Sequence, residues 1–222
     1  MSDLVLNENL KNWIERVVGF PFRVRHRVRA REKHKARVKA LETVRKTLRG
    51  TARLNAANIR TVFNVGLYVL LLDQDLALFT DDLVCAIGDR RRAFVAKHEA
   101  VLLYEAAEDL PQLLGKEFRD AVKTLGATPE QLERLNSVPS DLNRFWQKQR
   151  EFLGTIRNAL AAHRDHDALR YAETLKPREV MARGAELSPL LNRLARVLTE
   201  MAQLTVGPAA IVRDMVASTK KP

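Results

Sequence analysis

The chain has 222 residues, 46% of them hydrophobic, which is enough apolar material for one medium-sized domain with an extension or for two small domains. Its one cysteine, Cys85, excludes a disulfide within the chain, so we expect a cytoplasmic protein in which Cys85 is a small buried hydrophobe. The net charge of +11 resides in one segment, because Arg23 to Arg53 contains 13 Lys and Arg residues against two Glu.

The first predicted helix covers residues 5–18, where "MSDLVLNENLKNWIERV" has scattered charges and not the basic-then-apolar order of a secretion signal. In the basic segment "RVRHRVRAREKHKARVK", every odd position from 23 to 39 is Arg or Lys. Ala, Glu, Lys and Arg favour helix, so we predict a helix over 28–49. Six like-charge pairs at i,i+4 cost this helix about 1–3 kcal/mol in isolation, which favours a partner that neutralises them.

Three interpretations of the basic segment stay open. In the first, it binds a polyanion such as RNA, with Trp13, Phe20 and Phe22 nearby as stacking groups. Alternatively it is a solvated helix that keeps the protein soluble, or it docks on an anionic membrane surface, for which the segment itself lacks an apolar face. We favour the first interpretation and expect no membrane partner. It predicts RNA contacts from Arg23, Arg25, Arg27, Arg29, Arg31, Lys33, Lys35, Arg37 and Lys39.

The middle of the chain predicts helices over 55–78, 81–108, 111–125 and 129–136. Its most apolar run, "VFNVGLYVLLL" over 62–72, has eleven residues, whereas a bilayer needs about 20, so we expect a buried helix. Thr80-Asp81-Asp82 predicts the N-terminus of the second helix. Thr128-Pro129-Glu130-Gln131 has the pattern of a capping box and predicts the start of the fourth.

The remaining helices are predicted over 141–163, 177–183, 189–206 and 208–217. Pro139-Ser140-Asp141 and Ser188-Pro189 open two of them, and Gly126 and Gly207 lie where C-terminal caps belong. Asn-Gly and Asp-Gly hairpin turns between alternating apolar runs are missing from the sequence. We therefore predict an all-α bundle, 55–222, with a basic N-terminal helical arm, 1–54.

The helix predicted over 141–163 has a heptad-like stripe. Its members follow each other at spacings of 4 and 3 residues: Leu142, Trp146, Gln149, Leu153, Ile156, Leu160 and His163. Arg157 and His163 lie at the rim of this stripe, about 9 Å apart along the helix axis. A second copy packed antiparallel would bring Arg157 of one chain toward His163 of the other, which predicts a homodimer.

The stretch "IRNALAAHRD" resembles the signature of the HEPN superfamily, in which an arginine is followed by a polar residue and, a few residues later, by a histidine. Arg157, Asn158 and His163 match these three positions. The resemblance covers about residues 55–206 and includes the all-helical setting, with the motif on a late helix. Many HEPN proteins are metal-independent endoribonucleases that dimerise to form a composite cleft and act as toxins or in defence against phage.

The resemblance implies catalytic roles that suit RNA cleavage by its own 2′-hydroxyl. His163 would remove the hydroxyl proton, and Arg157 would stabilise the charge on the phosphate. Asn158 would orient either group, with Asp165 and His166 in support. No metal or cofactor is required, and a toxin of this kind would have an antitoxin protein as partner.

Three other interpretations of the motif stay open. "HRDHD" has the residues of a metal site, but they are bunched within five positions and no distant ligand is evident, so we expect no metal there. A HEPN-like domain without catalysis would serve as an RNA-binding or assembly module. In an unrelated helical interaction protein, His163 and Arg164 would only complement the dipole at a helix C-terminus.

Overall fold

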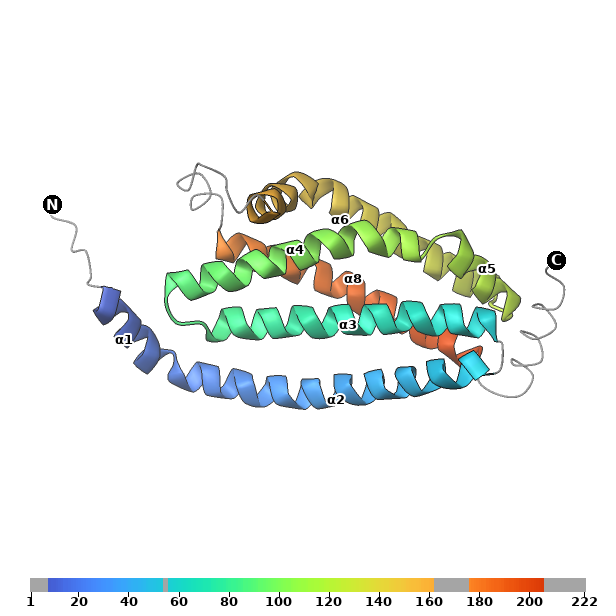
Figure 1. Cartoon of the computed structure of the whole chain (residues 1–222), viewed down its shortest axis with the longest axis horizontal. Coiled ribbons are helices and arrows are strands. Elements are labelled where there is room, and N and C mark those ends of the chain that lie inside the picture. Colours follow the sequence, from blue (N-terminus) through green and yellow to red (C-terminus); the bar gives the residue numbers. More distant parts are fainter. Residues whose placement is uncertain (1–7, 54–55, 162–175, 206–222) are drawn as a thin grey trace.

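The computed structural model describes residues 8–53, 56–161 and 176–205, and this part of the chain is all-α, as predicted. It forms an elongated bundle of long helices (Figure 1). In chain order the described helices are α1 (Glu8–Val18), α2 (Phe20–Arg53), α3 (Ala57–Cys85), α4 (Asp89–Leu113), α5 (Lys116–Thr124), α6 (Pro129–Ala161) and α8 (Pro177–Gln203).

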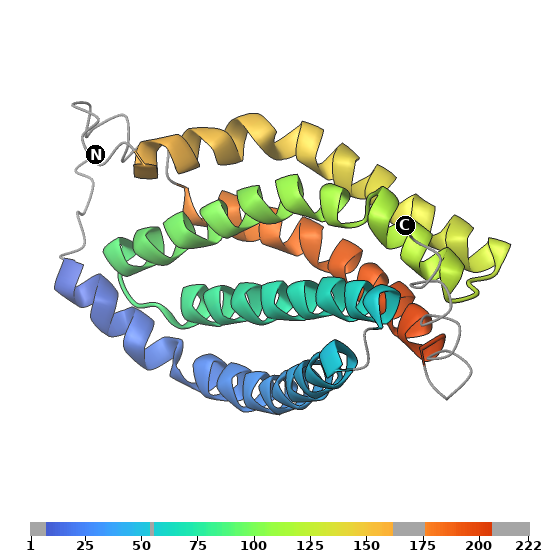
Figure 2. The same ribbon diagram turned by 45° about the vertical axis from the view of Figure 1, so that its right-hand side comes forward.

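Helix α3 occupies the middle of the bundle. It packs against α2 on one side and against α4 and α8 on the other, and α5 closes the end near its N-terminus. Helix α6 packs on α4 and α8, so α2 and α6 lie at opposite edges in both views (Figures 1 and 2). The apolar faces of α3, α4, α6 and α8 meet in a single core, which includes the fully buried Leu103, Leu153 and Leu194.

Helix α3 is, by length and composition, the one helix of the described residues that could cross a membrane. It has 29 residues, and the mean hydropathy of its most apolar stretch is 1.5. The length argument made from residues 62–72 therefore does not hold for the whole helix. The position of α3 gives a different reason to regard it as a core helix: its buried residues recur every three to seven positions and contact neighbouring helices of the bundle.

Several predicted helix boundaries are wrong. The break expected at Thr80–Asp82 does not occur, and α3 continues to Cys85. Asp81 lies within α3, where its carboxylate contacts His26 of α2. Cys85 is half-buried and not buried as expected. The chain turns instead at Gly88, whose φ of 85° favours glycine. The observed N-cap, Gly88, thus lies eight residues beyond the predicted one, Thr80.

The prolines were also misleading as boundary signals. Pro111, Pro139 and Pro189 lie inside α4, α6 and α8, where each removes a backbone hydrogen bond at a cost of about 3 kcal/mol. The apolar face continues across each of them, so burial offsets that cost. Around Pro139, for example, Val138 and Leu142 are both completely buried.

The capping box at the start of α6 is confirmed. The backbone N–H of Gln131 donates to Thr128 Oγ1 at 3.3 Å, and the backbone N–H of Thr128 donates to Gln131 Oε1 at 2.9 Å. Gly126, with a φ of 93°, ends the preceding helical segment as predicted. Gly207 and the helix predicted over 208–217 lie outside the described residues.

Candidate nucleic-acid interface and motif helix

The basic segment forms the 34-residue helix α2, which lies along α3. One ion pair and one histidine–aspartate hydrogen bond hold it there. The Arg37 guanidinium donates to both carboxylate oxygens of Asp73, at 2.5 and 3.5 Å, and His26 Nε2 lies 2.7 Å from Asp81 Oδ1. Leu41 is buried farther along the same face. The basic segment is therefore part of the bundle surface and has one face committed to α3.

Two of the nine residues predicted to contact RNA are engaged within the protein. Arg37 is paired with Asp73, as described. Arg23 donates to the backbone oxygens of Glu15 and Arg16, at 2.8 and 2.6 Å, and so caps the C-terminus of α1. These two positions hold helices in place and do not add to an outward-facing surface.

The other seven predicted cations are exposed on α2. They are Arg25, Arg27, Arg29, Arg31, Lys33, Lys35 and Lys39. Sequence reasoning left three further exposed cations of the same helix out of the candidate site, namely Arg45, Lys46 and Arg49. All three lie within Arg23–Arg53, the segment that carries the excess of positive charge, and this could have identified them from the sequence. The exposed positive surface therefore extends along α2 from residue 25 to residue 49, interrupted by Glu32 and Glu42.

A cavity of about 360 Å³ lies where α2 meets α3 and α8. Arg29 and Lys33 of α2 line it together with the two contacts that hold α2 on α3, and Ser188 lines it from α8. Positive side chains outnumber carboxylates around this cavity, so it extends the basic character of α2 into the groove beneath the helix.

The motif lies on the last turns of α6, and the structure describes only part of it. Arg157 is half-buried, and its guanidinium lies over the ring of Tyr104, 4.7 Å from the ring centroid. Asn158 beside it is exposed. His163, Asp165 and His166 lie outside the described residues, so their distances to Arg157 are not part of this structure.

The stripe that leads to the motif is confirmed as far as the structure describes it. Leu142, Gln149, Leu153 and Ile156 are buried, and Trp146 is half-buried. Gln149 donates to Glu186 of α8 at 3.0 Å, which satisfies the one polar member of this set. The stripe therefore faces α4 and α8 within the chain, and its buried part is not available to a second copy.

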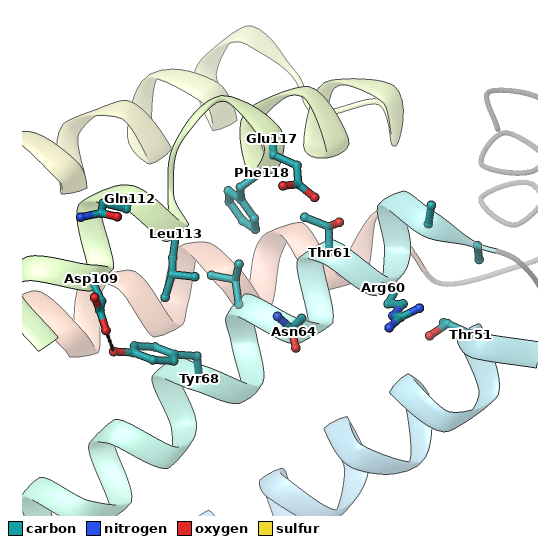
Figure 3. A pocket seen from close by; sticks show the side chains of 13 residues that line it. Thr51, Arg60, Thr61, Asn64, Tyr68, Asp109, Gln112, Leu113, Glu117 and Phe118 are labelled. Atoms are coloured by element: carbon teal, nitrogen blue, oxygen red, sulfur yellow. Dashed lines mark hydrogen bonds between the residues drawn. The ribbon is translucent and has the colours of Figure 1, made fainter. Parts of the chain in front are cut away.

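Figure 3 shows a second cavity, of about 790 Å³, at the end of the bundle where α3, α4 and α5 meet. Arg60 and Asn64 of α3 face it, as do Gln112 of α4 and Glu117 of α5. On its far side the Tyr68 hydroxyl donates to Asp109 Oδ2 at 3.1 Å.

Burial and the neighbouring Asp109 raise the pKa of Tyr68 to about 12, so its phenol stays neutral at ordinary pH. No sequence pattern pointed to this cavity, because its residues come from separate helices with no common spacing.

Glu99 of α4 is a carboxyl group inside the core. It is 0% exposed, and neither of its carboxylate oxygens has a hydrogen-bond partner. A Cβ atom added at Gly184 of α8 would lie 2.6 Å from Glu99 Oε1, so the carboxyl is packed directly against the α8 backbone. Burial raises its pKa to about 7.

Within residues 8–53, 56–161 and 176–205, no group of three or more His, Cys, Asp or Glu side chains is placed to hold a metal ion.

Comparisons of the chain with protein-family models, with curated proteins and with solved structures gave no match. The function is therefore argued from the chemistry of the surfaces described above.

Proposed function

We propose that the protein binds RNA along the exposed face of α2. The observation that carries this proposal is the row of exposed cations on a helix that is fixed to α3 by the Arg37–Asp73 ion pair and the His26–Asp81 hydrogen bond. The positive surface keeps its geometry because α2 is held in place. Phosphates that neutralise it also relieve the like-charge repulsion between successive turns.

Salt dependence distinguishes RNA binding from a merely solubilising role. The triple substitution Arg27→Ala, Arg31→Ala and Lys35→Ala removes three exposed cations that share one helix face. If each contacts a phosphate, the slope of log affinity against log salt for a single-stranded RNA falls by about 2. Fluorescence anisotropy over a salt series measures that slope.

A matched control removes the same charge elsewhere. Lys116, Arg119 and Lys123 are three exposed cations of α5, at the far end of the bundle, and their replacement by alanine should leave the slope nearly unchanged. Equal losses for the two triple variants would show that only net charge matters, and α2 would then return to the solubilising interpretation.

The narrower proposal is that the protein is a HEPN-like, metal-independent endoribonuclease that cleaves the RNA it gathers. It is supported by the all-helical bundle and by Arg157 and Asn158, adjacent on the last turns of a late helix. The ring of Tyr104 fixes the position of the Arg157 guanidinium, as a phosphate-stabilising group requires. His163 is proposed as the base, and Asp165 and His166 as its supports.

The same proposal includes a homodimer. Helix α2 and the motif helix α6 lie at opposite edges of the bundle, so RNA held by α2 of one chain reaches a motif most directly in a second chain (Figure 1). Size-exclusion chromatography with light scattering measures this assembly. A toxin or phage-defence role, with an antitoxin protein as partner, would follow from cleavage and is proposed only together with it.

Cleavage is tested by incubating the protein with a mixed RNA pool in the presence of EDTA. Arg157→Ala and His163→Ala should each abolish product formation. Arg150→Ala is the matched control, because Arg150 lies on the same helix with its guanidinium over the Trp146 ring, 5.8 Å from the centroid. A double variant at 157 and 163 that still cuts at the wild-type rate would overturn the enzymatic proposal. Salt-sensitive binding without product would identify a non-catalytic RNA-binding module.

A further inference from the structure

Helix α1 is attached to the bundle through its polar side. The Glu15 carboxylate accepts from the Arg92 guanidinium at 2.8 and 3.1 Å and from the backbone N–H of Gly88 at 3.4 Å. Asn12, one turn earlier, lies beside Gly88. Arg23 fixes the other end of α1 by donating to its last carbonyl groups. The hydrogen bond and ion pair with Glu15 raise the pKa of Arg92, so this contact is between full charges.

The apolar side of α1 consequently faces outward. Leu10, Trp13, Ile14, Val17 and Val18 fall within about 140° of the helix circumference, opposite Glu15 and Asn12. All five are exposed, with Trp13 at 60% and Val18 at 73%. A helix packed on a soluble bundle normally shows the reverse arrangement, with its apolar side buried.

Four more exposed apolar side chains follow in the first turns of α2, where they lie around the helix and not on one face. Phe20 and Phe22 are 62% and 63% exposed, and Val24 and Val28 are exposed as well. Of the thirteen large hydrophobic side chains exposed in the described part of the chain, nine lie between residues 10 and 28. We call these nine the N-terminal apolar patch. Exposed apolar residues concentrated in this way mark an interaction surface.

We propose that the N-terminal apolar patch docks the protein on the surface of an anionic lipid bilayer. The patch and its cations have the composition of an interfacial segment, in which Trp, Phe and Val enter the acyl boundary while Arg side chains meet the headgroups. Arg25, Arg27, Arg29 and Arg31 are exposed and interleave with or follow Phe20 to Val28 in α2.

This proposal reverses the expectation of no membrane partner. That expectation rested on the absence of an apolar face in the basic segment, and α1 supplies such a face. Charge complementarity between the arginines of α2 and anionic lipid headgroups favours a bilayer as the partner of this surface. An apolar protein partner alone would not require the adjoining arginines, whereas the negative surface potential of a bilayer attracts them over about a Debye length. The proposal does not depend on RNA binding, although Arg25, Arg27, Arg29 and Arg31 belong to both proposed surfaces.

Tryptophan fluorescence provides a direct test, because the chain has two tryptophans. Trp146→Phe leaves Trp13 as the one tryptophan that reports on binding. Phenylalanine keeps an aromatic ring against Tyr104, whose ring centroid lies 4.7 Å from that of Trp146 in an edge-on contact. The expected result is a blue shift of Trp13 emission on titration with vesicles of phosphatidylcholine and phosphatidylserine. Vesicles of phosphatidylcholine alone should bind at least about tenfold more weakly.

Substitutions in the same Trp146→Phe background locate the surface. Leu10→Ser with Val17→Ser should weaken vesicle binding by about tenfold or more, since two apolar side chains on the outward face of α1 no longer leave water. Leu71→Ser with Leu78→Ser is the matched control, because both leucines are exposed but lie on α3 outside the patch. Circular dichroism checks that each variant keeps its helix content.

Four outcomes would overturn the proposal. The first is an unchanged Trp13 spectrum with anionic vesicles, and the second is equal binding to both vesicle types. The third is equal loss of binding in the two double-serine variants. The fourth is a blue shift without lipid, either on raising the protein concentration or on adding RNA, which would assign the patch to a second copy of the chain or to nucleic acid.

Discussion

Glu99 is expected to make this protein less stable as the pH rises from about 5 to about 8. Its carboxyl is completely buried without a hydrogen-bond partner, and its pKa is raised from 4.5 to about 7. Between these two values the folded chain holds the proton and the unfolded chain releases it, so the free energy of unfolding falls as pH rises. The loss begins near the unfolded pKa and is complete just above the folded one.

The magnitude follows from the size of this shift. Each pKa unit corresponds to about 1.4 kcal/mol, so ionisation of Glu99 costs the folded state about 3 kcal/mol at a pH of about 8. Glu99→Gln keeps the shape of the side chain and removes its charge. The variant should therefore be more stable than the wild type by up to about 3 kcal/mol at that pH, and within about 1 kcal/mol of it at a pH of about 5.

Urea unfolding followed by circular dichroism, from about pH 5 to about pH 8, measures this difference. Taking the variant minus the wild type cancels the other titrating groups. One of these is Asp141, whose pKa is lowered by the hydrogen bond from Arg193 and whose contribution is lost at acid pH in both proteins. Glu108→Gln, an exposed position on the same helix, is the matched control and should give a flat difference. A flat difference for Glu99→Gln as well would refute the reasoning.

Three further predictions concern local structure. Asp73→Asn with Asp81→Asn should weaken RNA binding although it makes the protein more positive, because α2 loses the contacts that fix it on α3; a rise in affinity by anisotropy would refute this. Thr128→Ala should lower the free energy of unfolding by about 1 kcal/mol through loss of the capping box, measured by urea denaturation. Gly88→Ala should lower it by about 1–3 kcal/mol, because φ 85° with ψ 144° is a backbone conformation almost confined to glycine, and an unchanged melting temperature would contradict this.

Helix content was predictable from this sequence, whereas helix ends were less so. The apolar stripes of α3, α4 and α6 repeat with helical spacing, and burial follows the stripe wherever the structure describes it. A proline at the first position of a helix and a proline inside a helix have the same local pattern, however. Pro129 begins α6 and Pro139 lies within it, and tertiary packing on both sides of Pro139 makes the difference.

The candidate site was predictable to the extent that it depends on composition. Seven of the nine named cations are exposed because a dense run of charge has few internal partners. Arg23 and Arg37 differ because their partners are a helix terminus and an aspartate 36 residues away, which the local sequence does not reveal. The inverted orientation of α1 was unpredictable for the same reason: it depends on a contact between Glu15 and Arg92, 77 positions apart.

The docking of α2 changes how its charge acts. A free basic arm would lose conformational freedom on binding a phosphate chain, and that loss would reduce its affinity. Asp73 and Asp81 hold α2 on α3 through its inner side and leave the exposed cations at fixed spacing, so much of this entropy is already lost on folding. The same rigidity keeps α2 away from α6, the helix that carries Arg157, because the two helices lie at opposite edges of the bundle (Figures 1 and 2). RNA held on α2 would therefore reach the motif helix of a second chain more directly than that of its own chain, which is why the cleavage proposal includes dimerisation.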